Sequence, residues 1–145
     1  MFAVDTNVFV YAAERSYPEH DACRARVESW RRQRAPWGST WHVLYEFLRI
    51  MTHPRVLRAP CTAAQAWSFV EALLASPGFR LLTETAGHAE VVAGTVAELP
   101  DLRGNLMHDA RTAILLREHG VRRIYTRDTD FHRFPFLEVV DPIAG

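Results

Sequence analysis

The chain begins with FAVDTNVFVYAA at residues 2–13, the stretch that decides its fold class. The apolar run at residues 2–4 predicts a strand, and residues 8–13 continue without a breaker and predict a helix. The polar triplet DTN at residues 5–7 separates the two. A strand that leads directly into a helix is the repeating unit of α/β folds, so we expect the two element types to alternate along the chain.

The remaining sequence contains further predicted helices and strands. We expect further helices at residues 19–34, 41–51, 63–75, 88–99 and 106–119, and further strands at residues 79–82, 124–126 and 137–140. Candidate helix caps are Ser39 or Thr40, Thr62 and Asn105, and candidate helix ends are Pro36, Pro54, Pro77, Pro100 and Gly120. In the helix at 19–34, a buried stripe of Ala22, Val27 and Trp30 is expected among charged residues. These elements predict an α/β fold with a mostly parallel central sheet flanked by helices on both faces.

Size and composition predict one globular domain spanning residues 1–145. The chain has 145 residues, of which 48% are hydrophobic, and this excludes intrinsic disorder and repeat architectures. No apolar run approaches the ~20 residues that span a bilayer, and no signal sequence follows Met1, so we expect a cytoplasmic protein without membrane contact. Cys23 and Cys61 lack metal-ligand spacing and are interpreted as small buried side chains.

The charge balance argues against a protein that holds nucleic acid by bulk positive charge, because 17 basic and 17 acidic residues cancel. All of the basic residues other than histidine are arginines, several of them in clusters at residues 31–34, 55–58 and 122–127. Arginine binds phosphate oxygens through two parallel hydrogen bonds, although a GC-rich genome also favours arginine codons.

Acidic residues follow two of the predicted strands. Asp5 follows the first strand, and Asp128 follows the strand at 124–126, with Asp130 close behind it. Ligands of open α/β sheets bind outside the carboxyl ends of the strands, so these residues are candidate ligands. Aspartate is also common in turns, which leaves a purely structural role open for each residue taken alone.

Glu46 interrupts the apolar helix segment VLYEFLRIM, and we expect its carboxylate to be buried. A buried carboxylate needs a cation, and two partners are open: a metal ion, or Arg49 at the i+3 position. Asp109 lies near the start of the helix at 106–119, where the helix dipole also stabilises a negative charge. Four carboxylates brought together would repel one another unless a cation neutralised them, and oxygen ligands favour Mg²⁺ or Mn²⁺ over zinc.

With these residues in place, the sequence resembles the PIN-domain ribonucleases, particularly the VapC toxins of bacterial toxin–antitoxin pairs. The resemblance covers nearly the whole chain and rests on VDTNVFVYA at 4–12, Glu46, HDARTAILLREHGV at 108–121 and YTRDTDFHRFP at 125–135. It implies that Asp5, Glu46, Asp109 and Asp128 are catalytic metal ligands and that Asp130 is peripheral. It also implies that Thr6, Asn7 and Thr126 orient carboxylates or waters.

The resemblance further implies a reaction and partners. RNA would be cleaved to a 5′-phosphate and a 3′-hydroxyl by a water activated by one or two Mg²⁺ or Mn²⁺ ions. The partners would be a second copy of the chain and a VapB-type antitoxin, whose C-terminal tail would cover the site. His42 lies one helical turn before Glu46, and His108 immediately precedes Asp109, but we interpret both as solvated, and the four tryptophans as core or dimer interface.

Other readings of a small acidic α/β protein are weaker. A receiver domain and a P-loop each require a lysine, and the chain has none. A dinucleotide-binding domain requires glycines after the first strand, where residues 5–7 are DTN. Two alternatives on the same fold remain, namely a housekeeping PIN-type RNA-processing nuclease and a non-catalytic RNA-binding module.

Overall fold

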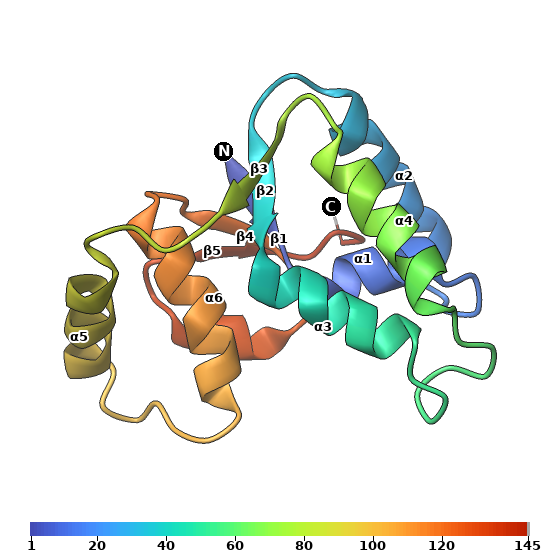
Figure 1. The fold of residues 1–145 in the computed structure, drawn as a ribbon. Coiled ribbons are helices and arrows are strands. Elements are labelled where there is room, and N and C mark those ends of the chain that lie inside the picture. The colour runs from blue at the N-terminus through green and yellow to red at the C-terminus, as the bar shows by residue number, and fades with distance from the viewer. Residues whose placement is uncertain (145) are drawn as a thin grey trace.

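The computed structural model describes residues 1–144 and contains a five-stranded parallel sheet (Figure 1). The strands are β1 (Phe2–Val4), β2 (Trp37–Thr40), β3 (Phe79–Leu82), β4 (Arg123–Tyr125) and β5 (Glu138–Val140), and their order across the sheet is β3-β2-β1-β4-β5. All four neighbouring pairs are parallel. The predicted α/β class and parallel sheet are confirmed.

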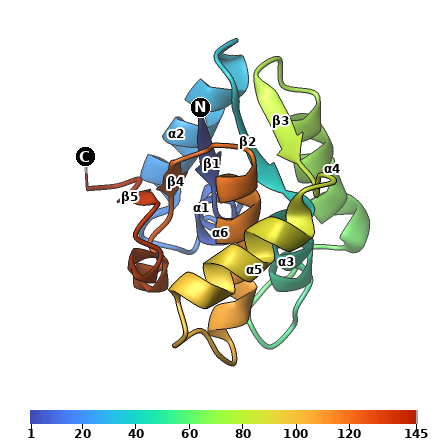
Figure 2. The same ribbon diagram turned by 90° about the vertical axis from the view of Figure 1, so that its left-hand side faces the viewer.

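Helices cover both faces of this sheet, as expected (Figures 1 and 2). They are α1 (Thr6–Ala13), α2 (His20–Arg32), α3 (Trp41–Met51), α4 (Ala63–Leu74), α5 (His88–Glu98), α6 (Leu106–Glu118) and a short 3₁₀ helix, η1 (Thr129–Arg133). Helices α1 to α4 share one apolar core, while α5, α6 and η1 pack on the other face. None of the helices in residues 1–144 is long and apolar enough to cross a membrane.

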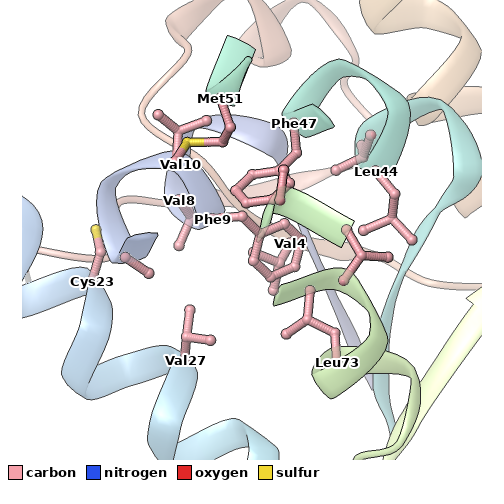
Figure 3. Close-up of a cluster of buried hydrophobic side chains, with 14 of the residues drawn as sticks. Val4, Val8, Phe9, Val10, Cys23, Val27, Leu44, Phe47, Met51 and Leu73 are labelled. Carbon is pink, nitrogen blue, oxygen red and sulfur yellow. The ribbon is translucent and has the colours of Figure 1, made fainter. Parts of the chain in front are cut away.

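Two apolar cores arise because successive strand residues point to opposite faces of the sheet. In β1, Ala3 joins the core beneath α6 and Val4 joins the core formed by α1 to α4. In the larger core, apolar side chains of α1, α2, α3 and α4 converge, among them the fully buried Phe9 and Phe47 (Figure 3). These contacts hold the amino end of α1 at the carboxyl end of β1.

Several predicted boundaries agree with the structure to within two residues, and two caps are confirmed. The Thr40 hydroxyl accepts a hydrogen bond from the Val43 amide, and Thr62 forms a capping box with Gln65. Asn105 occupies the cap position of α6, but its side chain makes no capping hydrogen bond.

Two predictions of local structure were wrong. Strand β2 was not predicted, because its sequence WGST lacks both alternation and a run of β-branched residues, yet all four residues are buried between β1 and β3. In α2, Ala22 is exposed and the buried stripe consists of Cys23, Val27 and Trp30. Packing against the sheet, rather than the local pattern, decided both cases.

Candidate active site

The candidate site lies where the direction of strand addition reverses. The chain leaves β1 to build β2 and β3 on one side of it, and later adds β4 and β5 on the other side. The carboxyl ends of β1 and β4 therefore lie side by side while the helices that follow them diverge, which is the usual position of a ligand site in open α/β sheets. The Asp5 amide donates a 3.0 Å hydrogen bond to the Tyr125 carbonyl and extends the strand pairing to this edge.

Thr126, the first residue after β4, organises this edge. Its hydroxyl donates a 2.8 Å hydrogen bond to the Asp5 carboxylate and accepts hydrogen bonds from the Asn7 side-chain amide at 2.9 Å and the Asp128 backbone amide at 3.0 Å. One hydroxyl offers one donor and two acceptor sites, so the capacity of this buried group is fully used. Thr126 thus joins Asp5 and Asp128 into one rigid unit.

Asn7 closes the same network. Its side-chain nitrogen also donates to the Asp5 carboxylate at 3.1 Å, and its side-chain oxygen accepts a 3.0 Å hydrogen bond from the Arg127 amide. Asn7 and Thr126 therefore both donate hydrogen bonds to the Asp5 carboxylate. Thr6 differs, because its hydroxyl donates to the Val43 carbonyl at 3.3 Å and so links α1 to α3.

Three carboxylates gather at this edge of the sheet, and Asp5, which lines the same cavity, lies outside their group. Carboxylate oxygens of Asp109, Asp128 and Asp130 all lie within 4.8 Å of one another, close enough to share a cation. The Asp130 amide donates a 2.9 Å hydrogen bond to the Asp128 carboxylate at the start of η1. The sequence analysis placed Asp130 at the periphery, whereas the structure places it within this group, because the turn of η1 folds it back.

The electrostatics of the cluster favour a bound cation. Burial, together with repulsion by Asp128, raises the pKa of Asp5 to about 6. Burial and the charges of Asp128, Asp5 and Asp130 raise the pKa of Asp109 to about 7. Positive charge that enters the cluster would lower both pKa values and favour the ionised carboxylates. The oxygen-only donor set fits Mg²⁺ or Mn²⁺, which prefer carboxylate and water ligands.

Glu46 faces the same cavity from α3 but is held by a different partner. Its carboxylate accepts a 2.6 Å hydrogen bond from the Arg49 guanidinium and lies outside the three-carboxylate group. The Glu46 side chain is 38% exposed, so the expected burial was wrong. The Arg49 hydrogen bond also lowers the pKa of Glu46. The sequence left a metal ion and Arg49 open as partners of the Glu46 carboxylate, and in the structure this carboxylate is paired with Arg49.

The cavity in front of the carboxylates has a volume of 710 Å³ and is open on one side. Its acidic wall comprises Asp5, Glu46, Asp109 and Asp128, and its other walls include Val10, Tyr11, Tyr17, Ile50 and Val56. With a cation on the acidic residues, such a cavity suits a ligand that pairs a phosphate with flat rings, as a nucleotide does, because the cation would bind the phosphate and the aromatic and aliphatic walls would contact the rings.

His42 and His108 meet at this cavity, which the sequence analysis did not anticipate. Their rings stack with centroids 5.8 Å apart and an interplanar angle of 10°. Burial, followed by the charges of Arg111 and His108, lowers the pKa of His42. The available sequence signal was the position of each histidine, in the first turn of its helix next to a candidate acid.

Comparison with known proteins identifies the family. The PIN domain family matches residues 2–137. The chain is 33% identical to Ribonuclease VapC48 of Mycobacterium tuberculosis over 141 residues, which cover 97% of each protein. It is 32% identical to Ribonuclease VapC33 of the same species over 146 residues, which cover 99% of each protein.

Solved structures show the same fold. VapBC2 from Rickettsia felis, bound to a DNA fragment from its promoter, superposes with a TM-score of 0.68 at 18% identity over 96% of both chains. VapC20 of M. tuberculosis, a toxin that cleaves the sarcin–ricin loop, superposes with a TM-score of 0.68 at 20% identity over 96% of this chain and 98% of that one. The family match covers nearly the whole length, and the identity to VapC relatives agrees with it. The chain therefore belongs to the PIN-domain family, among the VapC ribonucleases.

Proposed function

We propose that residues 1–145 form a single PIN domain that acts in the cytoplasm as a Mg²⁺- or Mn²⁺-dependent endoribonuclease, the toxin of a type II toxin–antitoxin pair. The observation that carries this proposal is that Asp5, Asp109 and Asp128 line the same cavity. The Thr126 hydroxyl connects two of these residues, because it donates to the Asp5 carboxylate and accepts from the Asp128 backbone amide. The fold alone serves many chemistries, so the argument rests on this cluster within a ribonuclease family.

Asp5, Asp109 and Asp128 would hold the cation, with Asp130 beside them and Glu46 on the facing helix. A divalent cation bound there would supply an activated water and charge stabilisation for the phosphodiester. The chain's own part is positioning. Thr126 and Asn7 fix the Asp5 carboxylate in one orientation through hydrogen bonds of 2.8 and 3.1 Å, so it need not reorganise during the reaction.

The cavity walls would bind the RNA around the scissile phosphate. Tyr11, Tyr17 and the stacked His42–His108 pair offer ring faces and edges to an unpaired base. Stacking on such rings tolerates any base, so affinity for single-stranded RNA would come from these walls. The products would carry a 5′-phosphate and a 3′-hydroxyl.

A toxin of this kind requires a partner that silences it. We propose a VapB-type antitoxin whose tail enters the same cavity, where the acidic floor would attract an arginine of the antitoxin. The structurally similar Rickettsia felis protein was solved as VapBC2 on promoter DNA, which supports such a partner. A homodimer in solution is part of the proposal.

The test is RNA cleavage by the purified protein and in cells. Transcriptome-wide mapping of RNA 5′ ends after brief induction compares wild type, Asp109→Asn and the control Glu71→Gln, an exposed acid on α4. We expect a new 5′ end with wild type and Glu71→Gln only. In vitro, EDTA should abolish cleavage and Mg²⁺ or Mn²⁺ should restore it.

The opposite results would overturn the proposal. Cleavage that survives in Asp109→Asn would exclude the carboxylate mechanism. The non-catalytic RNA-binding module would be favoured if wild type binds RNA in the presence of Mg²⁺ but leaves it intact, provided that the bound sequence is among the RNAs tested for cleavage. RNA cleavage without growth arrest, together with the absence of a VapB-type gene next to the gene for this chain, would favour the housekeeping nuclease.

A further inference from the structure

A second groove adjoins the carboxylate cluster at Asp130, which does not line the main cavity. It has a volume of 580 Å³ and is lined by Asp101, Arg103, Asn105, Leu106, Asp130 and Arg133. Asp130 belongs both to this groove and to the three-carboxylate group, while Asp128 and Asp109 line the main cavity. The acidic cluster therefore lies between two hollows, and a strand passing over it would continue into the second one.

The groove carries two cations that are available to a ligand. Within residues 1–144, neither the Arg103 nor the Arg133 guanidinium forms an ion pair or a hydrogen bond, although Asp101 and Asp130 line the same groove. Both side chains are exposed. Arginines such as Arg117, by contrast, are paired with neighbouring glutamates.

The backbone that carries these arginines is anchored. Arg133 ends η1 between Phe131 and Phe134, which are 1% and 0% exposed in the core beneath α6. Arg103 follows Leu102, which packs against the same core. Gly104 then adopts a φ of 58°, a left-handed conformation that turns the chain into α6. The α5–α6 connection and η1 lie close together in both ribbon views (Figures 1 and 2).

We propose that this groove binds the RNA backbone on one side of the scissile phosphate, with Arg103 and Arg133 pairing with flanking phosphates. The inference rests on the proposed ribonuclease function and extends it to the path of the substrate. The cation held by the carboxylates would serve the scissile phosphate, and the formal charge of the whole chain is zero, so arginines beside the cluster would supply the positive charge that attracts the flanking phosphates. Guanidinium forks match phosphate oxygens in the bidentate geometry that would hold such a strand.

The experiment uses an RNA whose cleavage site has been mapped with the wild-type protein. The full-length RNA is compared with versions trimmed close to the cleavage site on its 5′ or its 3′ side. The test variant is Arg103→Gln/Arg133→Gln, and the matched control is Arg32→Gln/Arg34→Gln, two exposed arginines near the end of α2, before the amino end of β2. Thermal unfolding checks that both variants retain the fold.

We expect the test variant to raise KM for the long RNA about tenfold and to leave kcat unchanged, because each phosphate contact binds substrate and transition state alike. Each lost contact should reduce the salt dependence of log affinity by ~0.7. Trimming the RNA on one side, and not on the other, should abolish the difference from wild type. Arg133→Lys should retain part of the affinity, since the charge remains while the fork is lost.

Three results would overturn the inference. The first is a test variant that binds and cleaves the long RNA as the control does. The second is an equal loss of affinity on the long RNA and on both trimmed RNAs. The third is a loss of affinity only for an acidic antitoxin segment, which would make the groove a protein-binding surface. A wild-type protein that cleaves no RNA would refute the proposed function instead, and the two failures are thereby distinguished.

Discussion

The Thr126 hydroxyl, directly after β4, donates a 2.8 Å hydrogen bond to the Asp5 carboxylate, directly after β1. The two residues are 121 positions apart in the sequence, and the parallel pairing of β1 with β4 brings them together. Because Thr126 also accepts from Asn7 and from the Asp128 amide, a single methyl-for-hydroxyl exchange would disturb three groups of the site.

Thr126→Val should therefore impair both stability and cleavage. The change leaves one N–H of the Asn7 side chain and the Asp128 backbone amide without the acceptor they have in wild type, which should cost about 1–3 kcal/mol in the free energy of unfolding. It also removes a hydrogen bond that lowers the pKa of Asp5, so metal affinity and cleavage should fall about 10–100-fold, as for other supporting residues around metal ligands.

Thr95→Val is the matched control for this prediction. Thr95 is fully buried in α5, donates to the Val91 carbonyl and accepts from Arg117, but it lies outside the cavity. Urea unfolding and cleavage at several Mg²⁺ concentrations should show a stability loss for both variants and a metal-dependent cleavage defect for Thr126→Val alone. An equal cleavage defect in both would refute the role given to Thr126.

The metal-free protein should lose stability as the pH rises from about 4 to about 7. The pKa of Asp109 is raised to about 7 and that of Asp5 to about 6 in the folded state, from 3.8, so the folded state binds more protons than the unfolded state in this window. Their contribution is fully present below pH 3.8 and is lost by about pH 7.

Asp109→Asn should flatten this profile and stabilise the metal-free protein at pH 8 by an amount on the order of 2 kcal/mol, because a neutral amide ends the repulsion. Mg²⁺ should raise the melting temperature of wild type and leave that of the variant nearly unchanged. Urea unfolding between pH 4 and pH 8 in EDTA measures the first effect, and a wild-type stability that rises over this range would contradict it.

Arg49→Met should release Glu46 toward the cavity. The ion pair is exposed, so its loss should change the free energy of unfolding by less than about 1 kcal/mol. If Glu46 contributes to metal binding, it must exchange Arg49 for the cation, and the variant should bind Mn²⁺ about two- to tenfold more tightly. Calorimetric titration without RNA measures this affinity. Weaker Mn²⁺ binding than in wild type would exclude Glu46 as a ligand that competes with Arg49.

Gly38→Ala should prevent normal formation of the central sheet. A Cβ atom at Gly38 would lie 2.0 Å from the Arg80 carbonyl oxygen in β3, so β2 and β3 would have to separate; we expect a loss of at least ~3 kcal/mol. Gly94→Ala is the control, because α5 leaves open space there and alanine favours helix by up to ~1 kcal/mol. Circular dichroism during thermal unfolding would show opposite shifts, and a neutral Gly38→Ala would refute the close approach.

Much of the local structure was predictable because caps and breakers act within a few residues. The boundaries of α3 and β3 were predicted correctly, and Gly120 ends the α6 segment with a φ of 70°, as its lack of a side chain allows. Strand β2 was not predicted because its place in the sheet depends on Gly38, which lets β3 approach closely. From the sequence alone, a glycine indicates a turn as readily as it indicates a strand.

The acidic residues were predictable as a group for a related reason. Carboxyl ends of parallel strands meet at one edge of a sheet, so Asp5 and Asp128 had to lie near each other once β1 and β4 paired. The sequence did not predict that Asp130 joins Asp109 and Asp128, nor that His42 stacks on His108, because these contacts depend on the turn of η1 and on how α3 and α6 pack.

By itself, the sequence determined the α/β class, the alternation of its elements, the candidate carboxylates and the ribonuclease family, since each depends on local periodicity, capping or motif. Only the tertiary structure decided how those carboxylates are used. The strand order β3-β2-β1-β4-β5 makes Thr126 the link between Asp5 and Asp128, and the packing of η1 beside the α5–α6 connection sets Arg103 and Arg133 next to the cluster. The physical reason is that hydrogen bonds and charge interactions act over a few ångströms in space, and packing alone determines which distant residues come that close.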